Sequence, residues 1–437
     1  MSGDRFVVLG VAQVRSPWFR EVARWATSAM LPVEFVKAMS VEEVRVRLRS
    51  GRGYSALLVD DSLPGVDRDL VELAREGGCA VLVVDSGRAS RQWGELGASA
   101  LLAATFARDE LLQVLQQVAT PITRSTAMSS ELTVEPHPTG FRGRLVAVSG
   151  APGTGRSTIA AALAQGLASD PRHTDVVCLA DLALNADQAM LHGSPDVVPG
   201  LTELVDGHRS GAPSIDDVRS LTWHIRTRGY ALLLGLRRHR DWTAVRPRAF
   251  AAALDGLRRG FRIVVADVDD DLEGEQATGS VDVEERNTIA RTTISAADLV
   301  LVVGEPGLKG LHSHLRATRA IVAHGPPGDR LLPVINRSPK GPRARAELTA
   351  AFGALLGDDG TGVPSPLHLP ERRHLDEVHR DGTRFPDSWL APVVTSVQAV
   401  LDREAEPDAR IEAPILEPIR PGSLGRWADD GDPIDPQ

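Results

Sequence analysis

The residues best suited to chemistry follow the apolar stretch V-A-V-S at 146–149. The next segment, G-A-P-G-T-G-R-S-T at 150–158, fits the pattern G-x-x-x-x-G-K-[ST], with arginine in place of lysine. Glycines in such a loop let successive backbone N–H groups surround phosphate oxygens, and a following helix adds the positive end of its dipole. The sequence therefore predicts a strand at 144–149, a phosphate-binding loop and a helix from 159. A glycine-rich turn without a ligand is the alternative.

Two side chains of this loop and one later carboxylate have predicted roles around a bound phosphate group. Arg156 is expected to reach the terminal phosphates, and the hydroxyl of Ser157 is expected to hold Mg²⁺. Asp267 closes the apolar run I-V-V-A-D, so it is the second candidate for the Mg²⁺ site. Asp181 closes V-V-C-L-A-D and is the candidate catalytic carboxylate, with a helix N-cap as its alternative.

The segment L-L-P-V-I-N-R ends in a further candidate pair, Asn336 and Arg337. An amide both donates to and accepts from the edge of adenine, so Asn336 is suited to base recognition. A turn asparagine is the alternative. The predicted nucleotide-binding residues are Gly150, Gly153, Thr154, Gly155, Arg156, Ser157, Thr158, Asn336 and Arg337.

Composition limits the class of protein that carries this loop. The chain has 437 residues, 42% of them hydrophobic, with a net charge of −9. No global basic field attracts it to nucleic acid. No signal peptide or membrane-length apolar run is present, so a cytoplasmic protein is expected. Cys79 and Cys178 both lie in apolar runs, which predicts buried thiols rather than a disulfide or a metal site.

The chain alternates strand and helix signals on both sides of a polar segment, which predicts two α/β domains. Expected are an N-terminal domain at 1–118, a linker at 119–143, a nucleotide-binding domain at 144–401 and a disordered acidic tail at 402–437. The first domain should hold a five-stranded parallel sheet and the second a larger doubly wound sheet. Predicted strands lie at 6–10, 32–36, 56–60, 80–84, 100–103, 144–149, 176–181, 230–235, 262–267, 299–303, 331–336 and 366–370.

The N-terminal domain resembles a response-regulator receiver domain of flavodoxin-like fold. Asp60 ends the third predicted strand four residues before Pro64, where receivers carry the phosphoacceptor. Their acidic pair is replaced here by G-V-A at 10–12, and their lysine falls near Ala104. The resemblance therefore implies a pseudo-receiver that docks or dimerises rather than one that is phosphorylated.

The second domain resembles the MinD/ParA family of P-loop ATPases. With the receiver-like domain before it, the chain is similar to the TadZ/CpaE branch, which is associated with Tad-type pilus assembly. The resemblance is carried by the phosphate loop, D-L-A-L after the second strand, P-G-L-T-E-L at 199–204, A-D-L-V-L-V-V-G-E-P at 297–306, V-I-N-R at 334–337 and L-P at 369–370. It implies ATP or ADP with Mg²⁺ and a nucleotide-dependent homodimer.

Departures from this family bear on catalysis. Ala151 stands where the family has a lysine that reaches the partner subunit's phosphates, Arg156 replaces the second lysine, and Ala183 replaces the second acid of a D-x-D motif. Loss of groups that stabilise the transition state implies weak hydrolysis or none. The expected function is a nucleotide-responsive positioning or scaffold protein of a pilus, secretion or division assembly, recruited to the pole or septum by protein partners.

Other functions remain as alternatives. One is an actively cycling MinD/ParA-type ATPase, which the retained Ser157, Asp181 and Asp267 leave open. Partition of DNA is disfavoured by the acidic charge, despite the basic cluster R-R-H-R at 237–240. Direct membrane anchoring is disfavoured because the chain ends in an acidic segment rather than a basic amphipathic helix.

Overall fold

The computed structural model of the chain describes residues 6–13, 16–28, 30–50, 52–87, 91–122, 141–194 and 198–403. Most of the predicted linker (123–140) and of the predicted acidic tail (404–437) lies outside these ranges. No helix among the described residues combines the length and the apolar character that a membrane span requires.

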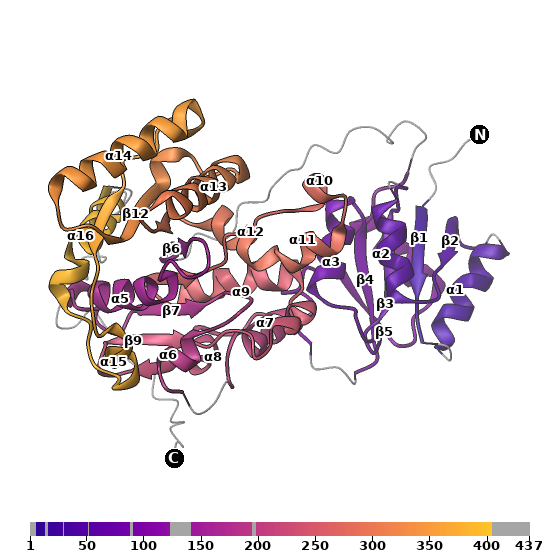
Figure 1. Ribbon diagram of the computed structural model, residues 1–437. Coiled ribbons are helices and arrows are strands. Elements are labelled where there is room, and N and C mark those ends of the chain that lie inside the picture. The colour runs from indigo at the N-terminus through magenta and orange to yellow at the C-terminus, as the bar shows by residue number, and fades with distance from the viewer. Residues whose placement is uncertain are drawn as a thin grey trace, which may run out of the picture.

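The first sheet is built from five parallel strands in the order β2-β1-β3-β4-β5. This is the order of doubly wound flavodoxin-like sheets, and the prediction of a parallel α/β sheet is confirmed (Figure 1). The central strand β3 (Ala56–Asp60) is buried along its whole length because helices cover both faces. Its elements are β1 (Phe6–Val11), α1 (Pro17–Thr27), β2 (Val33–Lys37), α2 (Val41–Arg49), β3, α3 (Arg68–Glu76), β4 (Ala80–Asp85), β5 (Ala100–Ala103) and α4 (Arg108–Val118).

The second sheet has eight strands in the order β13-β12-β11-β6-β10-β7-β9-β8. All pairs are parallel except β8 (Trp223–Ile225) with β9 (Tyr230–Leu233). The sequence did not predict β8, a three-residue edge strand too short for a periodic signal. The other strands are β6 (Arg144–Ser149), β7 (Val177–Asp181), β10 (Ile263–Asp267), β11 (Leu299–Gly304), β12 (Leu331–Ser338) and β13 (Leu367–Pro370).

Helices cover both faces of this second sheet. Helices α5 (Arg156–Ala168) and α16 (Asp387–Arg403) pack on one face, and α7 (Leu201–Ser210), α9 (Pro247–Gly260), α12 (Thr288–Ala296) and α13 (Leu308–His324) on the other. Helix α5 is rich in alanine, which lets most of it lie buried between the sheet and α16. The remaining helices are α6 (Gln188–Leu191), α8 (Ile215–Ser220), α10 (Glu275–Thr278), α11 (Val281–Arg286), α14 (Pro342–Leu356) and α15 (Leu375–Arg380).

The order of the strands places β6 between β10 and β11. From β6 the chain first builds the sheet toward β7 on one side and later toward β12 on the other. Ligands of open α/β sheets bind where the order reverses, outside the carboxyl ends of the strands. The loop after β6 lies at that point.

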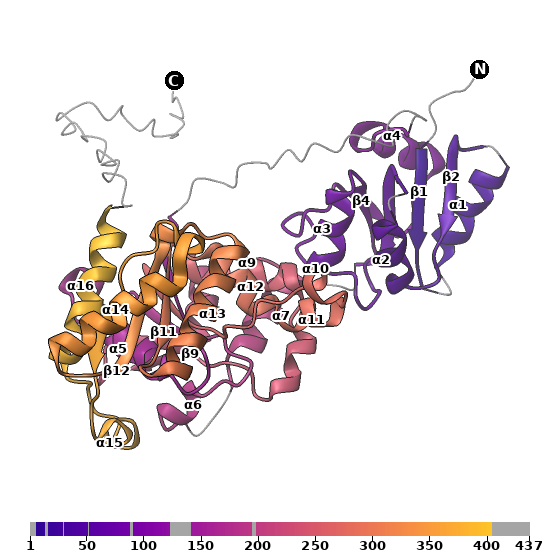
Figure 2. The same ribbon diagram turned by 45° about the horizontal axis from the view of Figure 1, so that its top comes forward.

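The two sheets meet through α3, which lies beside α7 and α9 (Figures 1 and 2). The buried carboxylate of Asp69 accepts hydrogen bonds from the backbone N–H groups of Arg248 and Ala249, at 2.9 and 3.2 Å. These groups lie in the first turn of α9, so a residue of the first sheet's layer caps a helix of the second. Arg209 also pairs with Asp67 at 3.0 Å, and the Arg248 guanidinium pairs with Glu76.

Candidate functional site

The loop after β6 has the backbone conformation of a phosphate-binding nest. Gly150, Gly153 and Gly155 have φ angles of +148°, +85° and +86°, in the region that favours glycine. Side chains would also collide there, since a Cβ on Gly155 would lie 2.5 Å from the Asn336 amide nitrogen. The glycine pattern read from the sequence is therefore required by local geometry.

Helix α5 begins directly after this nest. Its first helical hydrogen bond runs from the N–H of Ile159 to the carbonyl of Gly155. Within the described part of the chain, no acceptor takes up the N–H groups of Gly155, Arg156 and Ser157. Unpaired N–H groups and the helix dipole together favour an anion at this point.

The Arg156 side chain does not extend along the loop but turns toward two carboxylates. Its Nε donates to Asp267 Oδ1 at 2.7 Å, and its Nη1 donates to Asp269 Oδ1 at 2.9 Å. Although burial opposes the charge, the carboxylates of Asp267 and Asp269 raise the pKa of Arg156. The arginine is therefore a firmly charged partner of both acids.

Gln188 is a central residue of the site that the sequence analysis missed. Its Nε2 donates both to the Ser157 carbonyl at 3.0 Å and to Asp267 Oδ2 at 2.7 Å. The side chain is fully buried on α6 and ties the phosphate loop to the end of β10. In the sequence, Gln188 is marked only by its position seven residues after Asp181. A polar residue at that position does not by itself predict which groups it will contact.

Asp181 lies directly beside Asp267 because β7 and β10 pair in register at these two residues. Its oxygens accept backbone N–H groups, from Gln188 at 2.8 Å and from Ala183 at 3.4 Å. Burial and the neighbouring Asp267 raise the pKa of Asp181 well above its usual range. Asp181 thus binds the N–H of the first residue of α6, although the N-cap position itself is Asp187, and the Asp181 carboxyl has no exposed surface for a substrate.

The Asn336 and Arg337 pair braces the loop from the other side. Asn336 Nδ2 donates to the Thr154 carbonyl at 2.8 Å, and its Oδ1 accepts the N–H of Arg337. Arg337 Nη1 donates to the Gly153 carbonyl at 3.0 Å and to Glu305 at 2.9 Å. The Asn336 amide is thus engaged as in the turn alternative, whereas Arg337 stays half-exposed at the rim of the loop.

A second group of polar side chains holds the far side of the loop. The Thr158 hydroxyl lies 3.2 Å from His379 Nε2 on α15. His192 Nδ1 donates to the Gln188 carbonyl at 2.7 Å, so its Nε2 accepts from the Tyr230 hydroxyl at 2.6 Å. Burial lowers the pKa of His192 to about 4, so this histidine is neutral at physiological pH.

The predicted Mg²⁺ pair does not fit the metal in this arrangement. Ser157 and Asp267 are neighbours through Gln188, but each Asp267 oxygen already accepts a hydrogen bond, one from Arg156 and one from Gln188. The carboxylate is also fully buried, so it has no exposed face for a metal-bound water.

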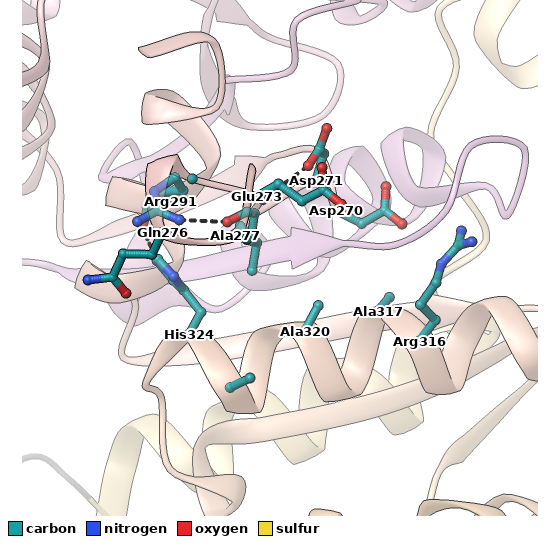
Figure 3. A pocket seen from close by; sticks show the side chains of 13 residues that line it. Asp270, Asp271, Glu273, Gln276, Ala277, Arg291, Arg316, Ala317, Ala320 and His324 are labelled. Atoms are coloured by element: carbon teal, nitrogen blue, oxygen red, sulfur yellow. Dashed lines mark hydrogen bonds between the residues drawn. The ribbon is translucent and has the colours of Figure 1, made fainter. Parts of the chain in front are cut away.

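A separate cleft of about 780 Å³ lies next to the loop that carries Asp269, between residues 270–277 and helices α12 and α13. Figure 3 shows Ala317 and Ala320 on its helical wall, with Asp270 and Asp271 opposite and Arg316 nearby. No residue of the phosphate loop lines this cleft. Asp270, which lines the cleft, directly follows Asp269 in the chain.

The receiver-like position Asp60 lies at the carboxyl end of β3, as its place in the sequence predicts. Ser16 and Ser62 donate hydroxyl hydrogen bonds to its two carboxylate oxygens. Burial acts to raise its pKa, but these hydrogen bonds outweigh it and the pKa of Asp60 is lowered. The backbone N–H of Ser62 also donates to this carboxylate, at 3.1 Å.

No protein-family model matches the chain, and no curated protein matches it. Among solved structures, it is similar to a ParA family ATPase from Chlorobium tepidum TLS, with 17% identity and a TM-score of 0.43 over 60% of this chain and 98% of that chain. It is similar to the cell division ATPase MinD of Pyrococcus furiosus, with 18% identity and a TM-score of 0.42 over 60% of this chain and 99% of that chain.

The septum site-determining protein MinD of Pyrococcus horikoshii OT3, complexed with Mg-ADP, is also similar, with 18% identity and a TM-score of 0.40 over 59% of this chain and 93% of that chain. The structural neighbours are thus ATPases of the ParA and MinD type. At these identities and TM-scores, the likeness assigns neither an activity nor a partner to this chain.

Proposed function

We propose that this chain is a nucleotide-binding protein that positions or scaffolds a larger assembly and hydrolyses its nucleotide slowly or not at all. The observation that carries the proposal is the glycine nest between β6 and α5, where the N–H groups of Gly155, Arg156 and Ser157 have no acceptor among the described residues and can hold phosphate oxygens. Its position at the reversal of strand order in the sheet supports ATP or ADP as the ligand.

Slow hydrolysis follows from what surrounds the nest. Rapid phosphoryl transfer needs a cation on the transferred group and a residue that orients the attacking water. Here the carboxylates of Asp267 and Asp269 offset most of the charge that Arg156 could place on a transferred group, and Asp181 and Asp267 are both fully buried. Ala151 and Ala183 supply no charge. Asp181 is therefore proposed as a structural cap rather than as a base.

A homodimer formed across the nucleotide edge is part of the proposal. Leu308 is 89% exposed and Met190 is 69% exposed, on helices that follow β11 and β7. Both helices follow strands at the carboxyl edge of the sheet, and α6 contacts the phosphate loop through Gln188 and Ser157. Apolar side chains exposed next to a nucleotide site favour association with a second copy of the chain.

The remaining functional proposals rest on the sequence resemblance. We assign 1–118 to a receiver-like docking domain and 144–401 to the nucleotide-binding domain. The chain is proposed to act in Tad-type pilus or secretion-system assembly, in the cytoplasm, recruited to the pole or septum by protein partners. A cycling ATPase is the second candidate, because the Ser157 hydroxyl lies at the helix start where such enzymes need it.

Calorimetric titration of the full chain with ATP and with ADP, with phosphate release measured on the same sample, tests the proposal. We expect binding, with turnover well below about one per second. Gly155→Ala should abolish binding, because its Cβ meets the Asn336 amide and its φ is positive. Gly353→Ala in α14, where a Cβ meets no atom within 4 Å, is the matched control. Absence of binding heat with both nucleotides would refute the proposal, and fast turnover would favour the cycling ATPase.

A further inference from the structure

The buried carboxylate of Asp267 already has a resident counter-ion. Arg156 Nε lies 2.7 Å from one of its oxygens, and Gln188 Nε2 lies 2.7 Å from the other. A buried carboxylate is stable only when it is paired and hydrogen-bonded. In this chain both conditions are met by side chains, so no external cation is needed to neutralise Asp267.

Entry of Mg²⁺ at Asp267 would disrupt more than one contact. Mg²⁺ requires near-octahedral oxygen ligands at about 2.0–2.1 Å, which the two donors now exclude. The ion would also repel the Arg156 guanidinium, which Asp269 holds in place at 2.9 Å. Displacement of Gln188 would further release the Ser157 carbonyl, which the same amide nitrogen binds.

Arg156 retains donors for a second partner while it pairs with the carboxylates. A guanidinium has five N–H donors in a planar fork. The contacts to Asp267 and Asp269 use Nε and Nη1. Within the described ranges, no acceptor is bonded to Nη2. Arg156 stands at the first position of α5, beside the unpaired N–H groups, so Nη2 can serve a phosphate oxygen there.

We propose that this chain binds its nucleotide without Mg²⁺, with Arg156 as the fixed cation that links Asp267 to the phosphates. This inference rests on the proposed function, since it concerns the same site. It makes Arg156 a positioning and specificity residue that replaces both a lysine and a metal ion. One guanidinium carries less charge than a lysine with Mg²⁺, so the expected affinity is modest.

The test is a calorimetric titration of the full chain with ATP and with ADP, once in excess Mg²⁺ and once in EDTA. We expect dissociation constants that agree within about twofold between the two conditions. Binding that needs Mg²⁺, or that Mg²⁺ tightens by about tenfold or more, overturns this inference and leaves the proposed function standing. Absence of binding in both conditions overturns the proposed function and this inference with it.

The variant Arg156→Lys is expected to make nucleotide binding depend on Mg²⁺. A lysine ammonium is a point charge that cannot bridge both carboxylates as the guanidinium fork does. Asp267 is then released, and Mg²⁺ should tighten nucleotide binding by about tenfold. Arg286→Lys makes the same chemical change at an arginine that pairs with Asp271, outside the loop, and should leave binding independent of Mg²⁺. Circular dichroism establishes that both variants are folded, and an Arg156→Lys variant that is folded, binds nucleotide and stays indifferent to Mg²⁺ counts against the proposal.

Discussion

At the scale of single residues, replacement of lysine by arginine changes which groups the loop cation can hold. A lysine offers one compact charge, whereas the guanidinium reaches Asp267 and Asp269 together through different nitrogens. Around this pair, Gln188 and Asn336 tie the loop to neighbouring strands. Side chains of the loop thus contact mainly other protein groups, which leaves the backbone N–H groups to bind the proposed ligand.

His192 makes stability depend on pH. Its Nε2 accepts hydrogen bonds from Tyr230 and Arg228, which requires the neutral ring. Burial lowers its pKa to about 4, below the unfolded value, so its contribution is present above about pH 6.5 and is lost as the pH falls toward 4. Urea unfolding at pH 7 and pH 5 should show a loss to which His192 contributes about 2 kcal/mol.

His192→Gln should reduce this loss, because an amide does not titrate. His224→Gln, at a half-exposed histidine of β8, is the control and should leave the pH dependence unchanged. Equal pH dependence in wild type and His192→Gln would show that the ring does not titrate as inferred.

Asp60 should not accept a phosphoryl group. Both of its oxygens are held by serine hydroxyls, and no lysine or acidic pair that would neutralise or bind Mg²⁺ occurs at the expected sequence positions. Mass spectrometry after incubation with acetyl phosphate should therefore show no added mass, while a phosphorylatable receiver protein treated in parallel gains one. A labile adduct that disappears in Asp60→Asn would reverse this conclusion.

The sequence predicted the residue types of the site better than their contacts. The loop pattern located Gly150 and Gly155 because local backbone geometry demands glycine there. It did not locate the Arg156 pair with Asp269, since that contact joins residues 113 positions apart through a loop of irregular structure. Gln188 was missed for the same reason, and the assigned base-recognition role of Asn336 overlooked a nearby carbonyl that its amide binds first.

At the scale of elements, strands were predictable because parallel, doubly covered strands are continuous apolar runs. β3, β6 and β10 lie within one residue of their predicted bounds. Neither the three-residue β8 nor the contact of α3 with α9 has such a signal. The contact of α3 with α9 depends on Asp69. In the sequence, Asp69 is an ordinary polar residue of a predicted helix, and nothing marks it as a contact to α9.

Asp69 should stabilise the contact between the two layers through α9. Its carboxylate satisfies two N–H groups at the start of that helix and lies near the positive end of the helix dipole. Asp69→Ala should lower the free energy of unfolding by about 1–2 kcal/mol in urea denaturation. Asp109→Ala, at an exposed acid in the first turn of α4, is the matched control and should change it by less than about 0.5 kcal/mol. If the two variants lose similar free energies of unfolding, the contact of Asp69 with α9 does not stabilise the protein as inferred.

At the scale of the whole molecule, α3 lies between two sheets to which we assign different roles. The second sheet carries the proposed nucleotide-binding loop after β6, and the first ends in the edge strand β5. Leu101 on that strand is 53% exposed. Unpaired edge strands with exposed apolar residues favour pairing with another chain. The proposed nucleotide site therefore belongs to the second sheet, whereas the proposed positioning surface belongs to the first.

The last prediction is that the edge formed by β5 and α4, rather than the acidic tail, carries the positioning signal. Leu101→Asp places a charge on the exposed edge and should disperse the foci of a fluorescent full-length fusion. Val46→Asp changes an apolar residue that is 69% exposed on α2, away from this edge, and should leave the foci intact. A chain that ends at residue 403 should also form foci, because a tail rich in acid and proline offers no membrane-binding face. Lost foci in the shortened chain, with foci retained in Leu101→Asp, would assign localisation to the tail and refute the proposed surface.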